Sequence, residues 1–389
     1  LLSSCHIYKS YDRPEDITTS GLYRDPVADN DTLVSDTTNF GNLPWREVFT
    51  DPQLQSLIEQ GLKQNTDLLS AALNVKAAEA SLMSARLAYA PSIGLSPQGT
   101  ISSFDKNAAT KTYSLPVTAS WQVDLFGQLL NSKRNAQVTL KQTKAYRQAV
   151  QTQVIANIAN MYYTLLMLDR QLEITQATAE VLKRNAETVQ ALSERSTYTS
   201  AALAQSKAAY AQVVASIPDI EQSIRETENA LSTFLGEAPH AIKRGTLEAQ
   251  VLPTELSAGV PIQLLSNRPD VKAAEMALAS CYYNTNSARA AFYPQITLSG
   301  SAGWTNSAGS AIINPGKLLA SAVGSLTQPL FYRGQNIARL KAAKAQEESA
   351  KLSFQQALLN AGSEVSNALS LYQKTSEKVE SRRLQVESA

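Results

Sequence analysis

The side chains that most often carry out chemistry in proteins are few in this chain of 389 residues. It has two histidines, His6 and His240, and two cysteines, Cys5 and Cys281. Catalytic triads and zinc sites that use histidine need it close to partner side chains. Here one histidine lies in a polar N-terminal segment and the other in a proline-bearing linker, so neither pattern is present. We therefore expect no enzymatic activity, no metal site and no cofactor of the usual kind.

Two carboxylates lie at matching positions, because Asp67 and Asp270 are 203 residues apart. Such a pair could suggest acid–base catalysis. However, Asp67 follows Asn65–Thr66 and Asp270 follows Arg268–Pro269, which are typical helix starts. Carboxylates at a helix start stabilise the exposed backbone amides. We therefore interpret both residues as helix-terminal groups.

A longer segment recurs with the same spacing. The residues from Ser84 to Ser96 resemble those from Ser287 to Ser299: an Ala-rich helix pattern reaches an aromatic residue, then a proline, and the hydrophobic period changes to alternation. Each half therefore predicts a helix, two strands and a further helix. The junctions between strands and helices are expected at Pro91, Gly127, Pro294 and Gly334.

The predicted strands have one apolar and one polar face. Between Tyr113 and Leu125, apolar residues occupy the odd positions and small polar residues occupy most of the even ones. Strands of about 10 residues with hydroxyl and amide groups on one face, and aromatic residues near their ends, are typical of a membrane β-barrel wall. The residues expected to face a water-filled lumen are Ser96, Gln98, Thr100, Thr118, Ser120, Gln122, Thr297, Ser299 and Ser301.

Four strands are too few to close a barrel, so the wall must be shared between subunits. Two copies would give eight strands and a filled interior, whereas three copies would give twelve strands and an open lumen. The strand pattern alone leaves both possibilities open.

The helices are predicted to be long and paired. A stretch without proline or glycine runs from after Gly127 to about Thr197, with apolar residues at steps of three and four. A second stretch with the same apolar steps follows to Gly236, and its Pro218 is expected to kink the helix. This period indicates a coiled coil, and a helix of about 70 residues would be about 100 Å long. The second-half helix begins at Gln335 and continues to Ala389, so the repeat predicts a further turn and return helix beyond that residue.

The N-terminal residues Leu2 to Cys5 are typical of the end of a bacterial lipoprotein signal peptide, after which the cysteine carries lipid such as palmitate. Because Leu1 is not a start methionine, we expect the preceding signal to have been removed. A net charge of +1 gives no indication of nucleic-acid binding. The domains expected from these patterns are a lipidated N-terminal segment 1–50, a first repeat 51–240 with strands in 92–125 and a helical hairpin in 128–236, a linker 241–260, and a second repeat 261–389 with strands in 295–331.

Several motifs together resemble the TolC family of outer-membrane efflux proteins, in its lipoprotein branch. They span nearly the whole chain and include Tyr11–Pro14, Trp45–Phe49, Asp51–Leu54, Asn65–Leu68, Asp124–Gly127, Arg268–Val271 and Gln328–Phe331. The resemblance implies a mainly α-helical homotrimer in which helices form an α-barrel continuous with a transmembrane β-barrel shared by the three subunits. It also implies an outer-membrane location with a periplasmic extension. The partners would be a periplasmic adaptor protein, an inner-membrane transporter and the outer-membrane lipid.

The resemblance implies a passive exit duct for small molecules such as drugs or other toxic compounds. The turn of the first helical hairpin would contact the adaptor through Thr199, Ser200, Ala201, Ala202 and Leu203. The residues that close the periplasmic mouth in the family would lie beyond Ala389, so none is assigned in this chain. Two alternatives stay open, a structural coiled-coil lipoprotein of the envelope and a type I protein-secretion conduit with the same fold.

Overall fold

The computed structural model describes residues 8–14, 17, 22, 44–103, 105, 108–195, 199–251, 268–306 and 317–388. The chain forms two compact units, each assembled from separate stretches of sequence. The first contains Leu1–Asp25, Asn74–Tyr146 and Pro261–Ala389, and the second contains Pro26–Leu73 and Arg147–Val260. These units alternate along the chain, so the division into two repeats describes the duplicated sequence and stays a prediction.

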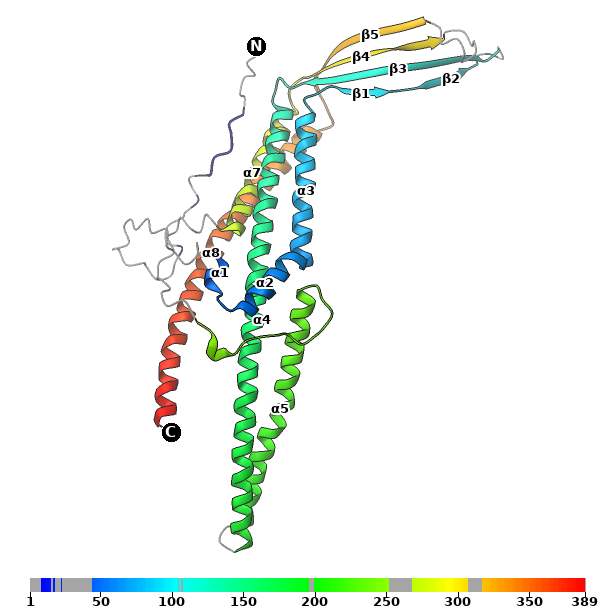
Figure 1. Ribbon diagram of the computed structural model, residues 1–389. Helices are drawn as coiled ribbons and strands as arrows, with labels where there is room; N and C mark the ends of the chain where they lie inside the picture. Colours follow the sequence, from blue (N-terminus) through cyan, green and yellow to red (C-terminus); the bar gives the residue numbers. More distant parts are fainter. Residues whose placement is uncertain are drawn as a thin grey trace. The chain divides into compact units, whose positions relative to one another are not determined.

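The first unit contains one antiparallel sheet (Figure 1). Its strands are β1 (Ser92–Leu95), β2 (Gln98–Ser102), β3 (Thr110–Val123), β4 (Gln295–Asn306) and β5 (Lys317–Thr327). Both β1 and β2 pair with β3, which pairs with β4, which pairs with β5. The sheet is therefore four strands wide, with β1 and β2 as two parts of one edge strand.

The break between β1 and β2 was not predicted, and it has a local cause. Pro97 lies in the gap and has no backbone N–H to donate to the sheet. The neighbouring Ser96 N–H still donates to the carbonyl oxygen of Pro116, over 3.0 Å. The register is unchanged by the break, since Ser92 pairs with Ser120, and Gln98, six residues later, pairs with Ser114, six residues earlier.

The helices of the first unit are the C-terminal part of α3 (Thr66–Leu87), the N-terminal part of α4 (Gln128–Glu194), α7 (Pro269–Ala290) and α8 (Gln335–Ser388). Val138 of α4 packs with Ala279 and Tyr283 of α7. A second core joins α7 and α8 through Val271, Phe354 and neighbouring apolar residues. The predicted order of helix, strand, strand and helix is thus confirmed in both halves.

The described part of the N-terminal segment packs on α7 and α8. The Tyr11 N–H donates to the Tyr283 hydroxyl over 3.1 Å. Further along, Arg13 makes two hydrogen bonds with the carboxylate of Glu275, and its Nη2 lies 2.6 Å from Oε2. Ile17 is buried in the α7–α8 core. This segment therefore runs along the helices, away from the sheet.

The second unit contains α1 (Trp45–Val48), α2 (Pro52–Gln64), the remainder of α3 and α4, α5 (Ser200–Phe234) and the 3₁₀ helix η2 (Leu247–Ala249). Its core is made from α2, α4 and α5, and its largest fully buried side chains include Ile58, Ile158, Tyr162 and Leu231. The predicted helical hairpin and its apolar stripe are therefore confirmed here, with the α4–α5 pair bounded within a few residues of the expected positions.

A polar network attaches the segment after α5 to this core. The Tyr162 hydroxyl donates to Oδ2 of Asp51 over 2.6 Å and accepts from the Gly245 N–H over 3.0 Å. Gln250 Nε2 donates to the same carboxylate oxygen over 2.7 Å. Burial alone would raise the pKa of Asp51, but the hydrogen bonds from Tyr162 and Gln250 lower it. The pKa of Tyr162 is raised, mainly by burial and then by the hydrogen bond to Asp51.

The helix-start interpretation holds for both carboxylates, with a correction at the first. At the start of α3, the side chain of Asn65 accepts the backbone N–H groups of Asp67 and Leu68, each over 3.1 Å. Asp67 lies in the first turn, so it acts there only through its charge. Asp270 accepts the N–H of Val271 over 3.0 Å and pairs with Arg268.

Candidate channel wall and helix–sheet junction

The pairing register assembles the predicted polar residues into rows that cross the sheet. Ser92, Ser120 and Ser299 are paired neighbours, as are Thr118 and Ser301. In the next row Gln122 pairs with Thr297. Side chains of directly paired residues share a face, so the predicted lumen residues of β3 and β4 lie on one face. Gln98 and Thr100 of β2 join the same face through their pairing with Ser114 and Thr112.

The polar face extends onto β5, which sequence reasoning missed. Ser321 pairs with Ser301 and Ser325 pairs with Thr297, while Val323 faces Ser299. The period-two spacing of Ser321, Ser325 and Thr327 was the available signal. It was obscured because the residues between them are small and one polar-face position is valine.

The hydroxyl groups of this face bond to the sheet itself. Ser92 Oγ donates to the Ser120 carbonyl over 3.1 Å, and Thr118 Oγ1 donates to the Gly94 carbonyl over 3.3 Å. The Ser301 and Ser321 hydroxyls lie 2.8 Å apart. Ser299, Thr305 and Ser325 each donate to a carbonyl of the neighbouring strand.

The opposite face is apolar and exposed in the single chain. It includes Ile93 at 74% exposure, Val117 at 46% and Trp304 at 49%. Trp121 and Leu298 are paired on the same face. Large apolar side chains exposed in contiguous rows on one sheet face indicate a surface that contacts lipid or another protein.

The predicted junction residues lie where helices and strands meet. Pro91 separates α3 from β1, and Pro294 separates α7 from β4. Gly127 and Gly334 immediately precede α4 and α8, with φ angles of +71° and +74°. This left-handed conformation strains residues that carry a Cβ atom, which explains glycine at both positions.

Hydrogen bonds hold the chain at these junctions. Trp121 Nε1 donates to the Tyr89 carbonyl over 2.9 Å, and Gln328 Nε2 donates to the Phe292 carbonyl over 2.9 Å. Tyr89 and Phe292 each lie two residues before a junction proline. The two repeats therefore anchor the same backbone position with different side chains.

Two other predicted sites are only partly within the described residues. Thr199 is the N-cap of α5, and its side chain accepts the Ala202 N–H over 3.2 Å. Residues 196–198 of the same turn, and Cys5, lie outside the described residues. Over the described ranges, no helix is long and apolar enough to cross a membrane. The same ranges contain no cluster of three or more His, Cys, Asp or Glu residues that could hold a metal ion.

Comparison with known proteins agrees over nearly the full length. A model of the outer membrane efflux protein family matches residues 57–237 and 260–389. The cation efflux system protein CusC of Escherichia coli strain K12 is 27% identical, over 98% of this chain and 83% of its own length. The toluene efflux pump outer membrane protein TtgC of Pseudomonas putida is 26% identical, over 98% and 81%.

Solved structures give the same result. The outer-membrane channel OprN superimposes with a TM-score of 0.86 at 26% identity, over 99% of this chain and 86% of that structure. The open-state outer membrane channel MtrE of Neisseria gonorrhoeae gives 0.78 at 26% identity, over 87% and 77%. The chain belongs to the outer membrane efflux protein family, and it is a TolC-type efflux channel of the bacterial outer membrane.

Proposed function

We propose that three copies of this chain close one twelve-stranded barrel, and that the barrel and the helices attached to it form the passive exit duct of a tripartite efflux pump. The observation that supports this most directly is the sheet, which is four strands wide with one polar and one apolar face. Unpaired backbone groups at a sheet edge are costly in lipid, so both edges need partners from other subunits.

The two edges of the first unit differ, as a closed ring requires. One edge is β1 and β2, which follow α3, and the other is β5, which precedes α8. Both adjoining helices expose apolar side chains, with Met83 and Leu87 on α3 and Ile337 and Leu352 on α8. Unlike surfaces that complement each other form head-to-tail rings. Three subunits provide twelve strands and room for a lumen, whereas two would give a filled barrel.

The polar face is the one that we assign to the lumen. Along β3, the polar-face residues Thr112, Ser114 and Thr118 are half-buried, whereas Leu115 and Val117 on the other face are exposed. This difference is expected when the polar face is the concave side of a curved sheet. We assign to the lumen the sequence-predicted set together with Ser321 and Ser325.

The assignment of faces can be tested with single cysteines. Ser120→Cys is expected to react rapidly with a charged, membrane-impermeant thiol reagent, because the side chain would face water. Val117→Cys, three residues away on the opposite face, is expected to react slowly with that reagent and to prefer an apolar one. The measurement is the labelling rate in intact outer-membrane vesicles. Reversed rates would place the lumen on the other face.

The assembly state provides the test of the proposed duct. The membrane-extracted protein is expected to have the mass of three chains after correction for bound detergent, and to form water-filled channels in planar bilayers. Light scattering combined with refractive index gives the mass. A protein that is released from membranes without detergent as a monomer or dimer would contradict the shared barrel and favour the structural coiled-coil alternative.

The proposed partners are a periplasmic adaptor and an inner-membrane transporter, with the turn at Thr199–Leu203 as the adaptor contact. We also propose a lipid anchor on Cys5. Tyr8, three residues later in the sequence, lies against Gly127 at the helix–sheet junction, and this position suits an anchor at the membrane surface. We propose no other cofactor and no catalytic site of the chain's own.

The proposed cargo is a small molecule such as a drug or another toxic compound. Relatives named for cation efflux and for toluene efflux match this chain at nearly equal identity. Soft metal ions prefer thiolate and thioether ligands, and the chain has only two cysteines and four methionines. This composition favours an organic cargo.

A further inference from the structure

At the ends nearest the sheet, four helices carry Lys and Arg residues. We call the stretches 80–90, 125–146, 276–294 and 328–346 the basic collar; all four lie in the first unit. They contain no Asp or Glu, and the acidic residues that directly flank them are Glu79, Asp124, Glu275 and Glu347. Their basic residues are Arg86, Lys133, Arg134, Lys141, Lys144, Arg289, Arg333, Arg339, Lys341 and Lys344. The whole chain has 35 Lys and Arg against 34 Asp and Glu, so the remaining sequence has 25 against 34.

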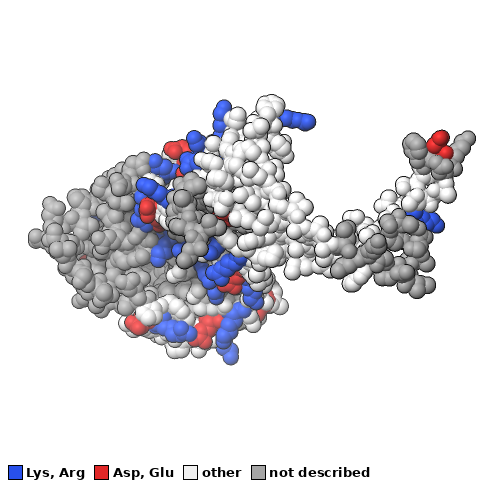
Figure 2. Space-filling model, turned by 90° about the horizontal axis from the view of Figure 1, so that it is seen from above, with Lys and Arg blue, Asp and Glu red and all other residues white. Residues whose placement is uncertain are grey.

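Few of these charges are neutralised by the protein. Among the described residues, one collar residue forms an ion pair: Lys144 Nζ lies 3.3 Å from the Glu79 carboxylate. Arg86, Arg339 and Lys341 are exposed to solvent. Figure 2 shows that the sheet, which extends to the right, carries few charged side chains, while Lys and Arg lie over the helices together with Asp and Glu. The ten basic residues of the collar therefore border a nearly uncharged sheet.

Four of the ten collar residues lie at the depth of a membrane headgroup layer. Arg86 and Arg289 lie in the last turns of α3 and α7, and Lys133 and Arg339 lie within six residues of the starts of α4 and α8. At 1.5 Å per residue, these side chains begin within about 9 Å of the helix ends. A headgroup layer adds about 5–8 Å on each side of the hydrocarbon core.

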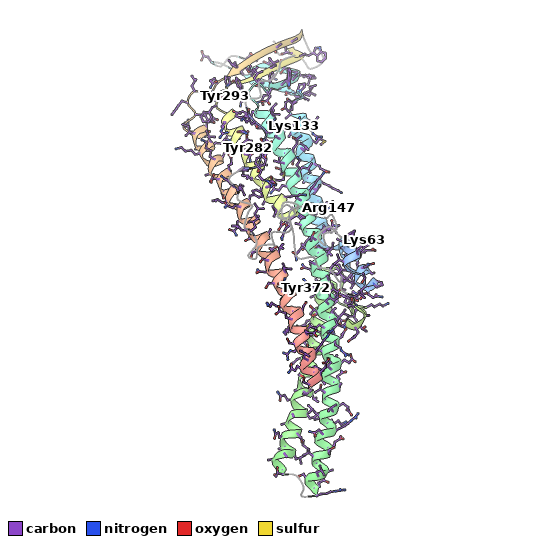
Figure 3. All side chains as sticks on the ribbon, turned by 90° about the vertical axis from the view of Figure 1, so that its left-hand side faces the viewer. Lys63, Lys133, Arg147, Tyr282, Tyr293 and Tyr372 are labelled. Atoms are coloured by element: carbon purple, nitrogen blue, oxygen red, sulfur yellow. The ribbon has the colours of Figure 1, made fainter. Side chains whose placement is uncertain are left out.

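Aromatic residues lie at the same level. The Lys133 Nζ lies 5.7 Å from the centre of the Tyr89 ring, and Tyr89 accepts a hydrogen bond from Trp121 of the apolar face. Phe126 stacks on Tyr293 with ring centres 5.0 Å apart. Lys133 and Tyr293 both lie near the sheet end of the helices in Figure 3. Aromatic rings with basic side chains beside them are typical of a membrane–water interface.

The contacts of the collar favour the lipid side over the lumen. Lys133 is linked through Tyr89 to Trp121, which points to the apolar face of the sheet. Arg134 Nη1 donates to the Tyr8 carbonyl over 3.4 Å, in the segment that follows the proposed lipid anchor. The polar face, in contrast, meets the helices through uncharged groups, since Gln122 and Gln295 both donate to Gln128 Oε1.

We propose that the basic collar binds the phosphate headgroups of anionic phospholipids in the membrane leaflet on the helix side of the barrel. This inference rests on the proposed function, because it requires the sheet to cross the membrane. Lysine and arginine near an anionic bilayer surface are attracted to it, and the attraction is screened by salt. The collar would fix the depth of the barrel in the membrane.

The test compares lipid selectivity in three forms of the full chain. The assembly is reconstituted in phosphatidylcholine vesicles with trace spin-labelled phosphatidylglycerol or phosphatidylcholine, and the motionally restricted fraction gives the relative affinity. The collar variant carries Arg86→Gln, Lys133→Gln and Arg339→Gln. The control carries Lys183→Gln, Lys207→Gln and Lys378→Gln, which remove the same charge from positions in α4, α5 and α8 outside the collar stretches.

The wild type and the control are expected to prefer phosphatidylglycerol, and the preference should weaken as salt rises. The collar variant should lose at least about fivefold of this preference, because about fivefold is the effect of one basic residue near an anionic surface and the variant removes three. An unchanged preference in the collar variant, or an equal loss in the control, would overturn the inference. So would a change in anion permeability without a change in lipid preference, which would place the collar in the lumen. Failure of the wild type to float with vesicles would instead contradict the membrane duct itself.

Discussion

Gly303→Ala is expected to remove most of the assembled protein from the outer membrane. Gly303 lies in β4, opposite Pro116 of β3, and is buried. A Cβ atom at this position would overlap Pro116 Cα and the Leu115 carbonyl oxygen. Both are backbone atoms, so no side chain can rotate to relieve the overlap.

The overlap must be relieved by separating β3 from β4, which join the two repeats. We expect a destabilisation of about 3 kcal/mol, at the upper end of the range for overpacking. The measurement is the amount of trimer in the outer-membrane fraction at equal expression. Because the proposed three-chain barrel would contain this strand pair three times, a moderate defect per chain would become a large loss of assembled channel.

Gly99→Ala is the matched control for this prediction. Gly99 also lies in a strand, but the nearest atom to its Cβ position is Cδ1 of the Tyr113 side chain, at 3.7 Å. This is an ordinary van der Waals distance, so near-normal assembly is expected. If both variants assembled equally well, the close approach at Gly303 would not govern pairing of the repeats.

Arg244→Met is expected to destabilise the second unit by about 3 kcal/mol, because it leaves the Glu228 carboxylate, whose side chain is only 15% exposed, without its counter-ion. Arg244 has only 14% of its side chain exposed and lies between Asp169 of α4 and Glu228 of α5. Its Nη2 lies 2.8 Å from Asp169 Oδ1, and its Nη1 lies 2.5 Å from Glu228 Oε1. The hydrogen bond to Asp169 is the main reason that the pKa of Arg244 is raised.

This arginine lies in the segment that follows the hairpin, so its ion pairs connect that segment to both helices. Within the segment it also donates to the Ile242 carbonyl over 3.0 Å. Urea unfolding of the detergent-solubilised protein, followed by far-ultraviolet circular dichroism, would measure the loss. Arg170→Met is the control, because Arg170 forms exposed ion pairs with Glu173 and Glu248. Exposed pairs contribute little, so similar loss in both variants would contradict a special role for Arg244.

The alternating strands were predictable because their pattern depends only on which face a residue occupies. In β3 the odd positions from Tyr113 to Val123 are almost all large and apolar, and the pairing places them on one face. In β5 the same rule was harder to apply, because Ala320, Ala322 and Gly324 on that face are small. Where side chains differ little in size and polarity, the pattern carries less information about the face.

The features that sequence reasoning missed depend on contacts between distant residues. Arg244 is 75 residues from Asp169, and no local pattern links them. Asn65, in contrast, had a local signal, since asparagine is among the best N-cap residues and precedes the apolar stretch of α3. Because Asp67 carries a charge, the sequence favoured it over Asn65 as the helix-terminal group.

The hydroxyl groups on the polar face have a consequence for what moves past them. A serine or threonine hydroxyl has one proton, and in Ser92, Thr118, Ser299 and Ser325 that proton is donated to a carbonyl of the sheet. At these four positions the surface offers oxygen lone pairs and no free hydroxyl donor. In the proposed duct, a passing carboxylate or phenolate would find little to hold it. These positions would be wetted by water yet bind anionic solutes weakly, so they would contribute little to the choice of cargo, which would then depend on the proposed partners.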